Sequence, residues 1–161
     1  MKNVLIVCWG NIYRSVVAEE LLRKVLIDRN MQDRYRIESR GIQGAMGVPP
    51  AEHANLRGYP ETYAQTRKIL EAYSISISEH KVSTPISRED AERADVILVL
   101  GEEALNKLQA EWQEAPAITQ KMRLLSSVAD PHNQKDADYL QNVVTQIAED
   151  IHRFAKTEFS Q

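Results

Sequence analysis

The chain has 161 residues, of which 43% are hydrophobic and 27% charged, and such a composition is typical of one globular domain spanning residues 1–161. The formal net charge is −3 and basic residues are scattered among acidic ones, which argues against a nucleic-acid-binding surface. No apolar run approaches the roughly 20 residues of a membrane-spanning helix, and the single cysteine excludes an internal disulfide. We therefore expect a cytoplasmic protein with no nucleic-acid partner and no membrane partner.

Hydrophobic periodicity predicts strands that alternate with helices along the chain. The first strand, residues 3–7, is a continuous apolar run, as expected of a strand that is covered on both faces. Further strands are predicted at residues 35–38, 95–100 and 122–125. Helices are predicted from Ser15, which is a candidate N-cap, and at residues 66–73, 102–112 and 136–154. This alternation predicts a parallel sheet with helices on both faces.

Two connecting segments have patterns of their own. Residues 41–63 contain repeated glycines and prolines, so an irregular loop is expected there. A short helix is expected to begin at Ser87, since Ser87 and Asp90 have the spacing of a capping box.

The segment after the first strand carries the residues with reactive chemistry. Cys8 follows that strand directly, Arg14 lies six residues later, and a helix is expected to begin at Ser15. Backbone N–H groups and the helix dipole attract an anion at such a place and stabilise the thiolate form of a cysteine. Gly10 allows a close approach of the backbone, and Asn11 tolerates left-handed conformations. A buried, inert cysteine is the alternative, but the strand–loop–helix context and the guanidinium fork of Arg14 favour a phosphate-binding nucleophile.

The sequence V-C-W-G-N-I-Y-R-S at residues 7–15 resembles the phosphate-binding loop of the low-molecular-weight protein tyrosine phosphatases, V-C-x-G-N-I-C-R-S-P. The resemblance continues through residues 18–19, 36–39 and 95–98, His80, and the Asp130-Pro131 pair, so it spans nearly the whole chain. It implies a single phosphatase domain of the α/β class with a doubly wound four-stranded parallel sheet. It also implies hydrolysis of phosphotyrosine (aryl phosphate) monoesters through a phosphocysteine, with no cofactor and no metal.

The resemblance also implies a role for each matching residue. Cys8 is the expected nucleophile, Arg14 the transition-state clamp, and Asp130 the general acid and base. The expected phosphate-binding residues are Trp9, Gly10, Asn11, Ile12, Tyr13, Arg14 and Ser15. Asn11, Ser15 and His80 are expected to hold the loop in shape, with His80 bonded to Ser15. The implied partners are a phosphotyrosine-containing protein or a small aryl phosphate, with phosphate, sulfate or vanadate as inhibitors.

The chain departs from the family pattern near the expected nucleophile. Tyr13 replaces the usual second cysteine, so an oxidised Cys8 has no internal resolving thiol. Leu100-Gly101 replaces the family's Met-Asp, which removes one supporting carboxylate unless Glu102 substitutes for it.

Other departures concern the substrate cleft, which Trp9, Arg40 and His132 are predicted to line. His132 stands where relatives often carry an aromatic ring, and this weakens the expectation of stacking on phosphotyrosine. Trp9 is a candidate replacement for that ring, and a partly buried packing residue is the alternative for it. Residues 47–63 form a longer segment than in the family, which is a substrate lid, a docking loop or a tolerated insertion.

Three alternatives compete with this interpretation. A non-catalytic phosphate- or phosphoprotein-binding module of the same fold is one. A thioredoxin-linked arsenate reductase is excluded for this chain alone, because that chemistry needs several cysteines. An arginine phosphatase is the third, although that branch resembles G-N-T in the loop, whereas Ile12 here leaves room for a flat aromatic ring.

Overall fold

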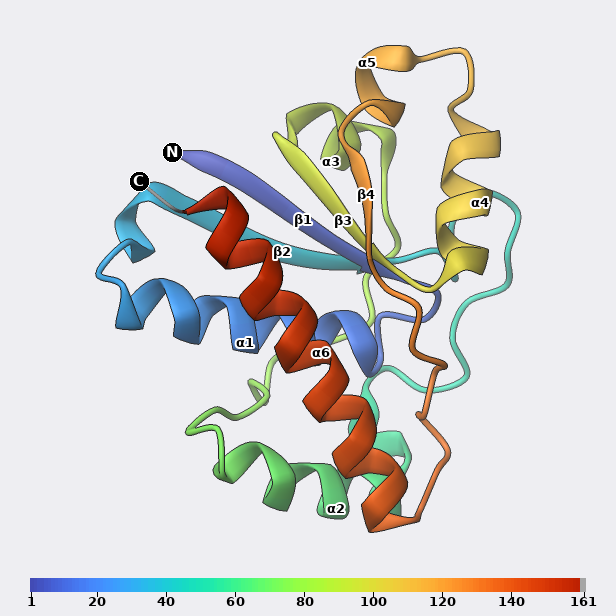
Figure 1. Ribbon diagram of the computed structural model, residues 1–161. Helices are drawn as coiled ribbons and strands as arrows, with labels where there is room; N and C mark the ends of the chain where they lie inside the picture. The colour runs from blue at the N-terminus through green and yellow to red at the C-terminus, as the bar shows by residue number, and fades with distance from the viewer. Residues whose placement is uncertain (160–161) are drawn as a thin grey trace.

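A four-stranded parallel sheet with the order β2-β1-β3-β4 forms the centre of the computed structural model, which describes residues 1–159 (Figure 1). The strands are β1 (Lys2–Cys8), β2 (Tyr35–Gly41), β3 (Val96–Leu100) and β4 (Met122–Ser126). Cys8 pairs with Gly41 on one side, and Val7 pairs with Val99 on the other. Because all strands run parallel, their carboxyl ends share one edge of the sheet.

Helices cover both faces of this sheet (Figure 1). The helices are α1 (Arg14–Asp28), α2 (Pro60–Glu71), α3 (Arg88–Arg93), α4 (Glu102–Glu111), α5 (Pro116–Thr119) and α6 (Ala137–Glu158). α1 and α6 cover one face, α3, α4 and α5 cover the other, and α2 packs on α6. The predicted fold class, a doubly wound four-stranded parallel sheet, is confirmed.

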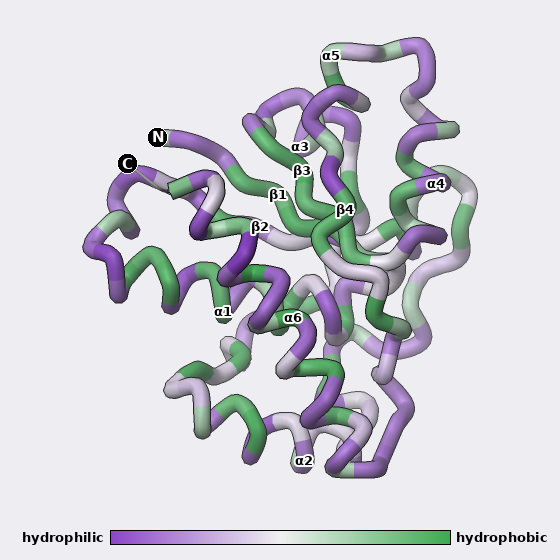
Figure 2. The backbone as a smooth tube through the Cα atoms, in the orientation of Figure 1, coloured by the Kyte–Doolittle hydropathy of each residue, from purple (hydrophilic) through white to green (hydrophobic). Residues whose placement is uncertain are grey.

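The apolar run of β1 is explained by burial on both faces. Val4 and Ile6 belong to the core cluster beneath α1 and α6, whereas Leu5 and Val7 belong to the cluster beneath α3 and α4. Successive side chains of a strand point to opposite faces, so four consecutive apolar residues contribute side chains to both clusters in turn. Figure 2 shows the same distribution, with hydrophobic segments along β1 and β3. This double anchoring fixes the end of β1, where Cys8 lies.

Several element boundaries differ from the prediction. α1 begins at Arg14, and Ser15 is not its N-cap, because its hydroxyl contacts Cys8 instead. α2 begins at Pro60, since proline fits the first turn of a helix, where its missing N–H is not needed. The Ser87–Asp90 capping box is confirmed at the start of α3.

Shorter elements complete the chain. Single 3₁₀ turns occur at Gln32–Arg34 and at Leu56–Gly58, the second of which lies within the loop predicted at residues 41–63. The short helix α5 was not predicted. The side chains of Lys2 and Glu158 lie 3.7 Å apart, which brings the two ends of the chain together (Figure 1). Among residues 1–159, none of the helices has the length and apolar character to cross a bilayer.

Candidate active site

The sulfur of Cys8 lies at the carboxyl edge of the sheet, where β1 turns into α1. The Asn11 N–H donates to Cys8 Sγ at 3.2 Å, and Ser15 Oγ lies 3.0 Å from the same sulfur. Cys8 itself is buried. The sulfur of Cys8 thus has two polar neighbours in a buried position.

Asn11 organises the loop around this sulfur. Its backbone is left-handed, with a φ of 55°, which turns the chain back toward Cys8. The Asn11 Nδ2 group donates to Ser15 Oγ at 2.9 Å and to Ser39 Oγ at 3.0 Å. The Thr84 N–H donates to Asn11 Oδ1 at 3.0 Å, so the side-chain amide is held on both of its ends. Asn11 and Ser15 therefore lie where loop-supporting residues are expected.

The hydrogen bonds continue from Asn11 to a buried carboxylate. Ser39 Oγ donates to Glu19 Oε1, while Glu19 Oε2 pairs with Arg23 at 2.6 Å. Lys81 Nζ lies 3.6 Å from Glu19 Oε1. Burial lowers the pKa of Lys81, and the charge of Glu19 partly opposes that effect. A continuous chain of contacts thus links Glu19 to the sulfur of Cys8.

The guanidinium of Arg14 is buried and held on two of its nitrogens. Arg14 is 1% exposed, and its Nη1 donates to the Val128 carbonyl oxygen at 3.1 Å. Its Nη2 lies 3.1 Å from Glu103 Oε1 and 4.0 Å from Asp130 Oδ2. The buried Nε has no partner within residues 1–159. The Nε–H of Arg14 therefore remains available for an oxygen of an anion.

Backbone N–H groups of the loop are also without protein partners. Within the described chain, no hydrogen bond engages the N–H of Gly10, Ile12 or Tyr13. These amides lie at the N-terminus of α1, where the helix dipole is positive. With the Arg14 Nε–H, they form a binding site suited to a tetrahedral oxyanion. Over the same residues, no group of three or more histidine, cysteine or acidic side chains is placed to hold a metal ion.

Asp130 approaches this site from the segment between β4 and α6. The His132 N–H donates to Asp130 Oδ1 at 3.1 Å, and His132 Nδ1 lies 3.1 Å from Asp130 Oδ2. The His132 ring meets the Tyr59 ring edge-on at 4.9 Å. Burial raises the pKa of Tyr59, and the charges of Glu52 and Asp130 add to that effect. Asp130 is 27% exposed, so it borders both Arg14 and solvent.

Tyr13 fills the interior behind the loop. Its side chain is fully buried, and Thr66 Oγ1 of α2 donates to its hydroxyl oxygen at 2.9 Å. Burial raises the pKa of Tyr13 to about 12, with a smaller contribution from the charge of Asp130, so the phenol stays protonated at neutral pH. Tyr13 thus joins the loop to α2 and contributes no thiol to the site.

Two predicted site residues lie elsewhere. His80 is exposed, and no hydrogen bond joins its ring to Ser15 within residues 1–159, so that prediction is wrong; Lys81 is the neighbour that turns inward. Arg40 is not in the cleft, because its Nε donates to Asp90 Oδ2 at 3.1 Å and its Nη1 to the Ser39 carbonyl.

A supporting carboxylate comes from an unpredicted position. Glu103, and not Glu102, pairs with Arg14, whereas Glu102 Oε1 lies 3.4 Å from the Ser127 hydroxyl. The sequence could have indicated Glu103, because it lies in the first turn of α4, which directly follows β3. Ligands bind at this edge of a parallel sheet.

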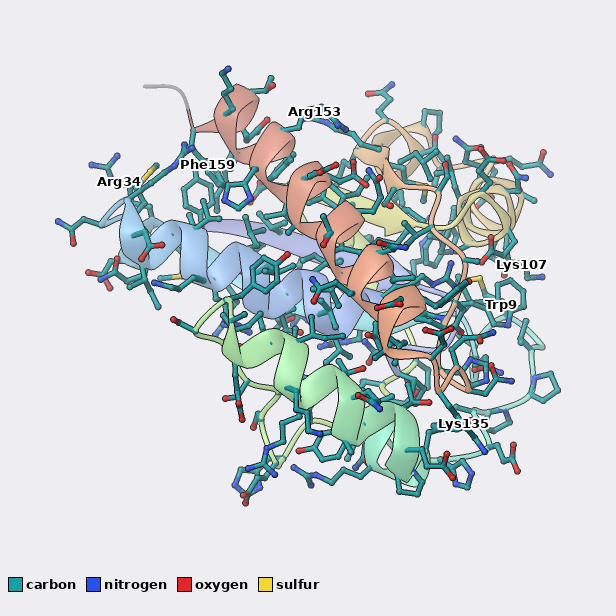
Figure 3. All side chains as sticks on the ribbon, turned by 60° about the horizontal axis from the view of Figure 1, so that its bottom comes forward. Trp9, Arg34, Lys107, Lys135, Arg153 and Phe159 are labelled. Carbon is teal, nitrogen blue, oxygen red and sulfur yellow. The ribbon has the colours of Figure 1, made fainter. Side chains whose placement is uncertain are left out.

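Trp9 begins the loop and lies on its outer side. Its side chain is half-buried and packs against the core cluster beneath α3 and α4. Figure 3 shows Trp9 at the same end of the molecule as Lys107 of α4. His132 is likewise half-buried, so both predicted cleft residues are partly accessible.

Comparison with known proteins gives consistent matches. The sequence model of the family described as low molecular weight phosphotyrosine protein phosphatase matches residues 3–159. A protein of that name from Pongo abelii is 31% identical over 147 residues, covering 86% of this chain and 84% of its own. A low molecular weight protein-tyrosine-phosphatase from Acinetobacter johnsonii is 28% identical over 138 residues, covering 84% of each chain. The crystal structure of a Drosophila arginine phosphatase is similar with a TM-score of 0.74 and 25% identity, covering 98% of this chain and 97% of its own.

Proposed function

Because the chain belongs to the low molecular weight phosphotyrosine protein phosphatase family, we propose that it hydrolyses phosphotyrosine and other aryl phosphate monoesters through a phosphocysteine. One observation carries this proposal: the polar contacts on Cys8 Sγ lie in the same loop as amides and an Arg14 Nε that lack protein partners. Residues 1–161 then act as one phosphatase domain. We place it in the cytoplasm, where reducing conditions keep a lone thiol active.

In the first step, the Cys8 thiolate attacks phosphorus in line with the leaving oxygen. The S–P bond forms as the P–O bond to the aryl oxygen breaks. The Arg14 Nε–H and the loop amides bind the nonbridging oxygens and stabilise their charge in the transition state. Asp130, which lies 4.0 Å from Arg14, gives its proton to the departing phenolate.

In the second step, water hydrolyses the phosphocysteine. The Asp130 carboxylate takes a proton from the attacking water, and the S–P bond breaks as the new P–O bond forms. The sulfur leaves as a thiolate, and the hydroxyl of Ser15, 3.0 Å away, donates to it. Inorganic phosphate is released and Asp130 is again protonated for the next cycle.

The substrate side of the site fits an aromatic leaving group. Trp9 and His132 are our candidates for the walls of the cleft, and Tyr59 packs against His132. Phosphate, sulfate and vanadate are expected to compete with substrate, because each presents oxygens to the same loop. The partner is a phosphotyrosine-containing protein or a small aryl phosphate.

Hydrolysis of p-nitrophenyl phosphate tests the proposal. Cys8→Ser should abolish turnover, and Asp130→Asn should lower kcat by roughly 10²–10⁴-fold. The matched control is Asp138→Asn, which makes the same change at an exposed position of α6. Wild-type turnover that survives both site substitutions contradicts the assignment. Vanadate binding by the wild type without hydrolysis favours a non-catalytic phosphate- or phosphoprotein-binding module instead.

A second candidate is arginine phosphatase activity. The similar Drosophila structure is described as an arginine phosphatase, and Glu103 and Asp130 place two carboxylates beside Arg14, where a guanidinium leaving group finds partners. Matched peptides carrying phosphotyrosine, phosphoserine or phosphoarginine separate the two activities. A higher kcat/KM for the phosphotyrosine peptide supports the first proposal, and a higher value for phosphoarginine overturns it.

A further inference from the structure

We propose that Glu103 is a positioning residue that sets the orientation of the Arg14 guanidinium. In this proposal Gly101 leaves the space in which Glu103 contacts Arg14. This inference rests on the proposed function, in which Arg14 binds the phosphoryl oxygens. It concerns two residues that do not themselves contact the substrate.

The carboxylate of Glu103 reaches Arg14 from the solvent side. Glu103 lies in the first turn of α4, directly after β3, and its Oε1 is 3.1 Å from Arg14 Nη2. The Glu103 side chain is 53% exposed, whereas that of Arg14 is 1% exposed. The Val128 carbonyl holds Nη1 at 3.1 Å. These two contacts, on Nη1 and Nη2, fix the plane of the guanidinium and leave its Nε–H for an anion.

Asp130, the proposed proton donor, is the second carboxylate near Arg14 Nη2, at 4.0 Å against 3.1 Å for Glu103. A buried guanidinium that loses its partner acquires another, because an unpaired buried charge is costly. Without Glu103, Arg14 turns toward Asp130 and holds it as a carboxylate. Both the binding of phosphate by Arg14 and the supply of a proton to the leaving group are then impaired.

Gly101 provides the space for this ion pair. Its φ of 97° lies in a region that favours glycine. A Cβ at this position would lie 2.5 Å from Arg14 Nη1 and 2.6 Å from Glu103 Oε1. The backbone cannot easily retreat, because the Gly101 N–H donates to the Ser126 carbonyl at 2.8 Å. A side chain at position 101 and the Arg14–Glu103 contact therefore exclude each other.

The test compares Glu103→Ala with Glu102→Ala, which removes the same charge from the adjacent exposed residue. The readouts are kcat/KM for p-nitrophenyl phosphate and for phenyl phosphate, the inhibition constant of vanadate, and Tm. Glu103→Ala should lower kcat/KM by about 10–100-fold and weaken vanadate inhibition by a similar factor, as expected for a misplaced binding group. The loss should be larger for phenyl phosphate, whose leaving group depends more on a proton. Glu102→Ala should stay within about twofold of wild type.

Two further variants extend the comparison. Glu103→Gln keeps an acceptor oxygen without the charge, so its effect should be intermediate. Gly101→Ala should reproduce the loss of vanadate affinity, and combining it with Glu103→Ala should add little, because both disrupt one contact. Full additivity of the two changes overturns the coupling of Gly101 to Glu103.

The outcomes separate this inference from the proposed function. Wild-type turnover with equal kinetics and equal vanadate affinity in the Glu103 and Glu102 variants overturns the positioning role alone. If the wild type binds vanadate without turnover, the proposed function fails, while weaker binding by Glu103→Ala still supports the positioning of Arg14. If the wild type does not bind vanadate, both fail.

Discussion

The hydroxyl of Ser15 lies 3.0 Å from the sulfur of Cys8, within hydrogen-bonding distance. Asn11 Nδ2 already donates to the Ser15 oxygen, so that oxygen acts as an acceptor on one side. Ser39 is arranged in the same way, since it accepts from Asn11 and donates to Glu19. A carboxylate only accepts hydrogen bonds, so Ser39 donates to Glu19, while the Asn11 amide donates to both serines. The hydroxyl hydrogen of Ser15 is therefore available for a hydrogen bond to the sulfur.

Ser15→Ala should therefore slow turnover while leaving the loop in place. Loss of a hydrogen bond to a charged acceptor costs about 1.5–3 kcal/mol, which corresponds to a decrease in kcat of about 10–100-fold. The measurement is steady-state hydrolysis of p-nitrophenyl phosphate, with Ser127→Ala, at an exposed position, as the control. A kcat that equals that of the control would show that the sulfur does not depend on this hydroxyl.

The Tyr13–Thr66 contact should contribute to stability through its two hydroxyls together. Both residues are fully buried, so Tyr13→Phe leaves the Thr66 hydroxyl without its partner and should cost about 1–3 kcal/mol. Adding Thr66→Val should recover part of this loss, because the unpaired hydroxyl is removed. Urea unfolding of the two single variants and the double variant measures the coupling, with Tyr139→Phe as an exposed control. Strictly additive losses would contradict it.

Asp90 should stabilise the fold in a pH-dependent way. Burial alone raises the pKa of its carboxyl, but hydrogen bonds from Ser87 and the charge of Arg40 outweigh burial and hold the pKa below its usual value. A lowered folded-state pKa gives stability that is present above the unfolded pKa of about 3.9 and is lost as the pH falls through the folded value. Asp90→Asn should thus cost about 1–3 kcal/mol at neutral pH.

The same variant defines the low-pH test. Below the unfolded pKa of about 3.9 the carboxyl is protonated first in the unfolded chain and only at lower pH in the folded one, so the difference between wild type and Asp90→Asn should shrink as the pH falls. Unfolding in urea across this range measures it, with Glu89→Gln as an exposed neighbour for comparison. A difference that stays constant with pH would rule out the ionised form of Asp90 as the source of stability.

Peroxide should inactivate the protein in a way that thiols reverse poorly. The chain has one cysteine, and Tyr13 occupies the position of the expected partner thiol, so a sulfenic acid on Cys8 cannot be captured as an internal disulfide. Prolonged exposure should carry it to the sulfinic acid, seen by mass spectrometry as two added oxygen atoms. Bound phosphate should protect. Full recovery with a thiol after long exposure would count against this prediction.

The sequence was most informative where the residues of the site are contiguous. Cys8 to Ser15 form one strand–loop–helix unit, so local pattern was sufficient to bring a cysteine, loop amides and a guanidinium together. The fold class followed from periodicity, because β1 and β3 are buried on both faces and therefore apolar throughout. Comparison with known proteins then confirmed the family.

Prediction failed where a side chain's partner is set by distant elements. Arg40 lies next to the sheet edge, yet it pairs with Asp90 of α3. His80 and Lys81 differ by one position in an irregular segment, and no periodicity indicates which of them turns toward Glu19. Glu103 reaches Arg14 only because Gly101 lacks a side chain. Such contacts depend on tertiary packing, which residue type and spacing do not determine.

The order of the strands in the sheet determines which part of the molecule unfolds first. β1 is hydrogen-bonded on both sides, whereas β4, which leads to Val128 and Asp130, is an edge strand beside β3. Amide protons of β4 should exchange with solvent before those of β1, since edge segments open at lower free energy. Gentle warming would then loosen the segment that carries Val128 and Asp130 while the loop at the end of β1 stays folded. A partly opened molecule of this kind would keep its loop amides but lose the Val128 contact that holds Arg14.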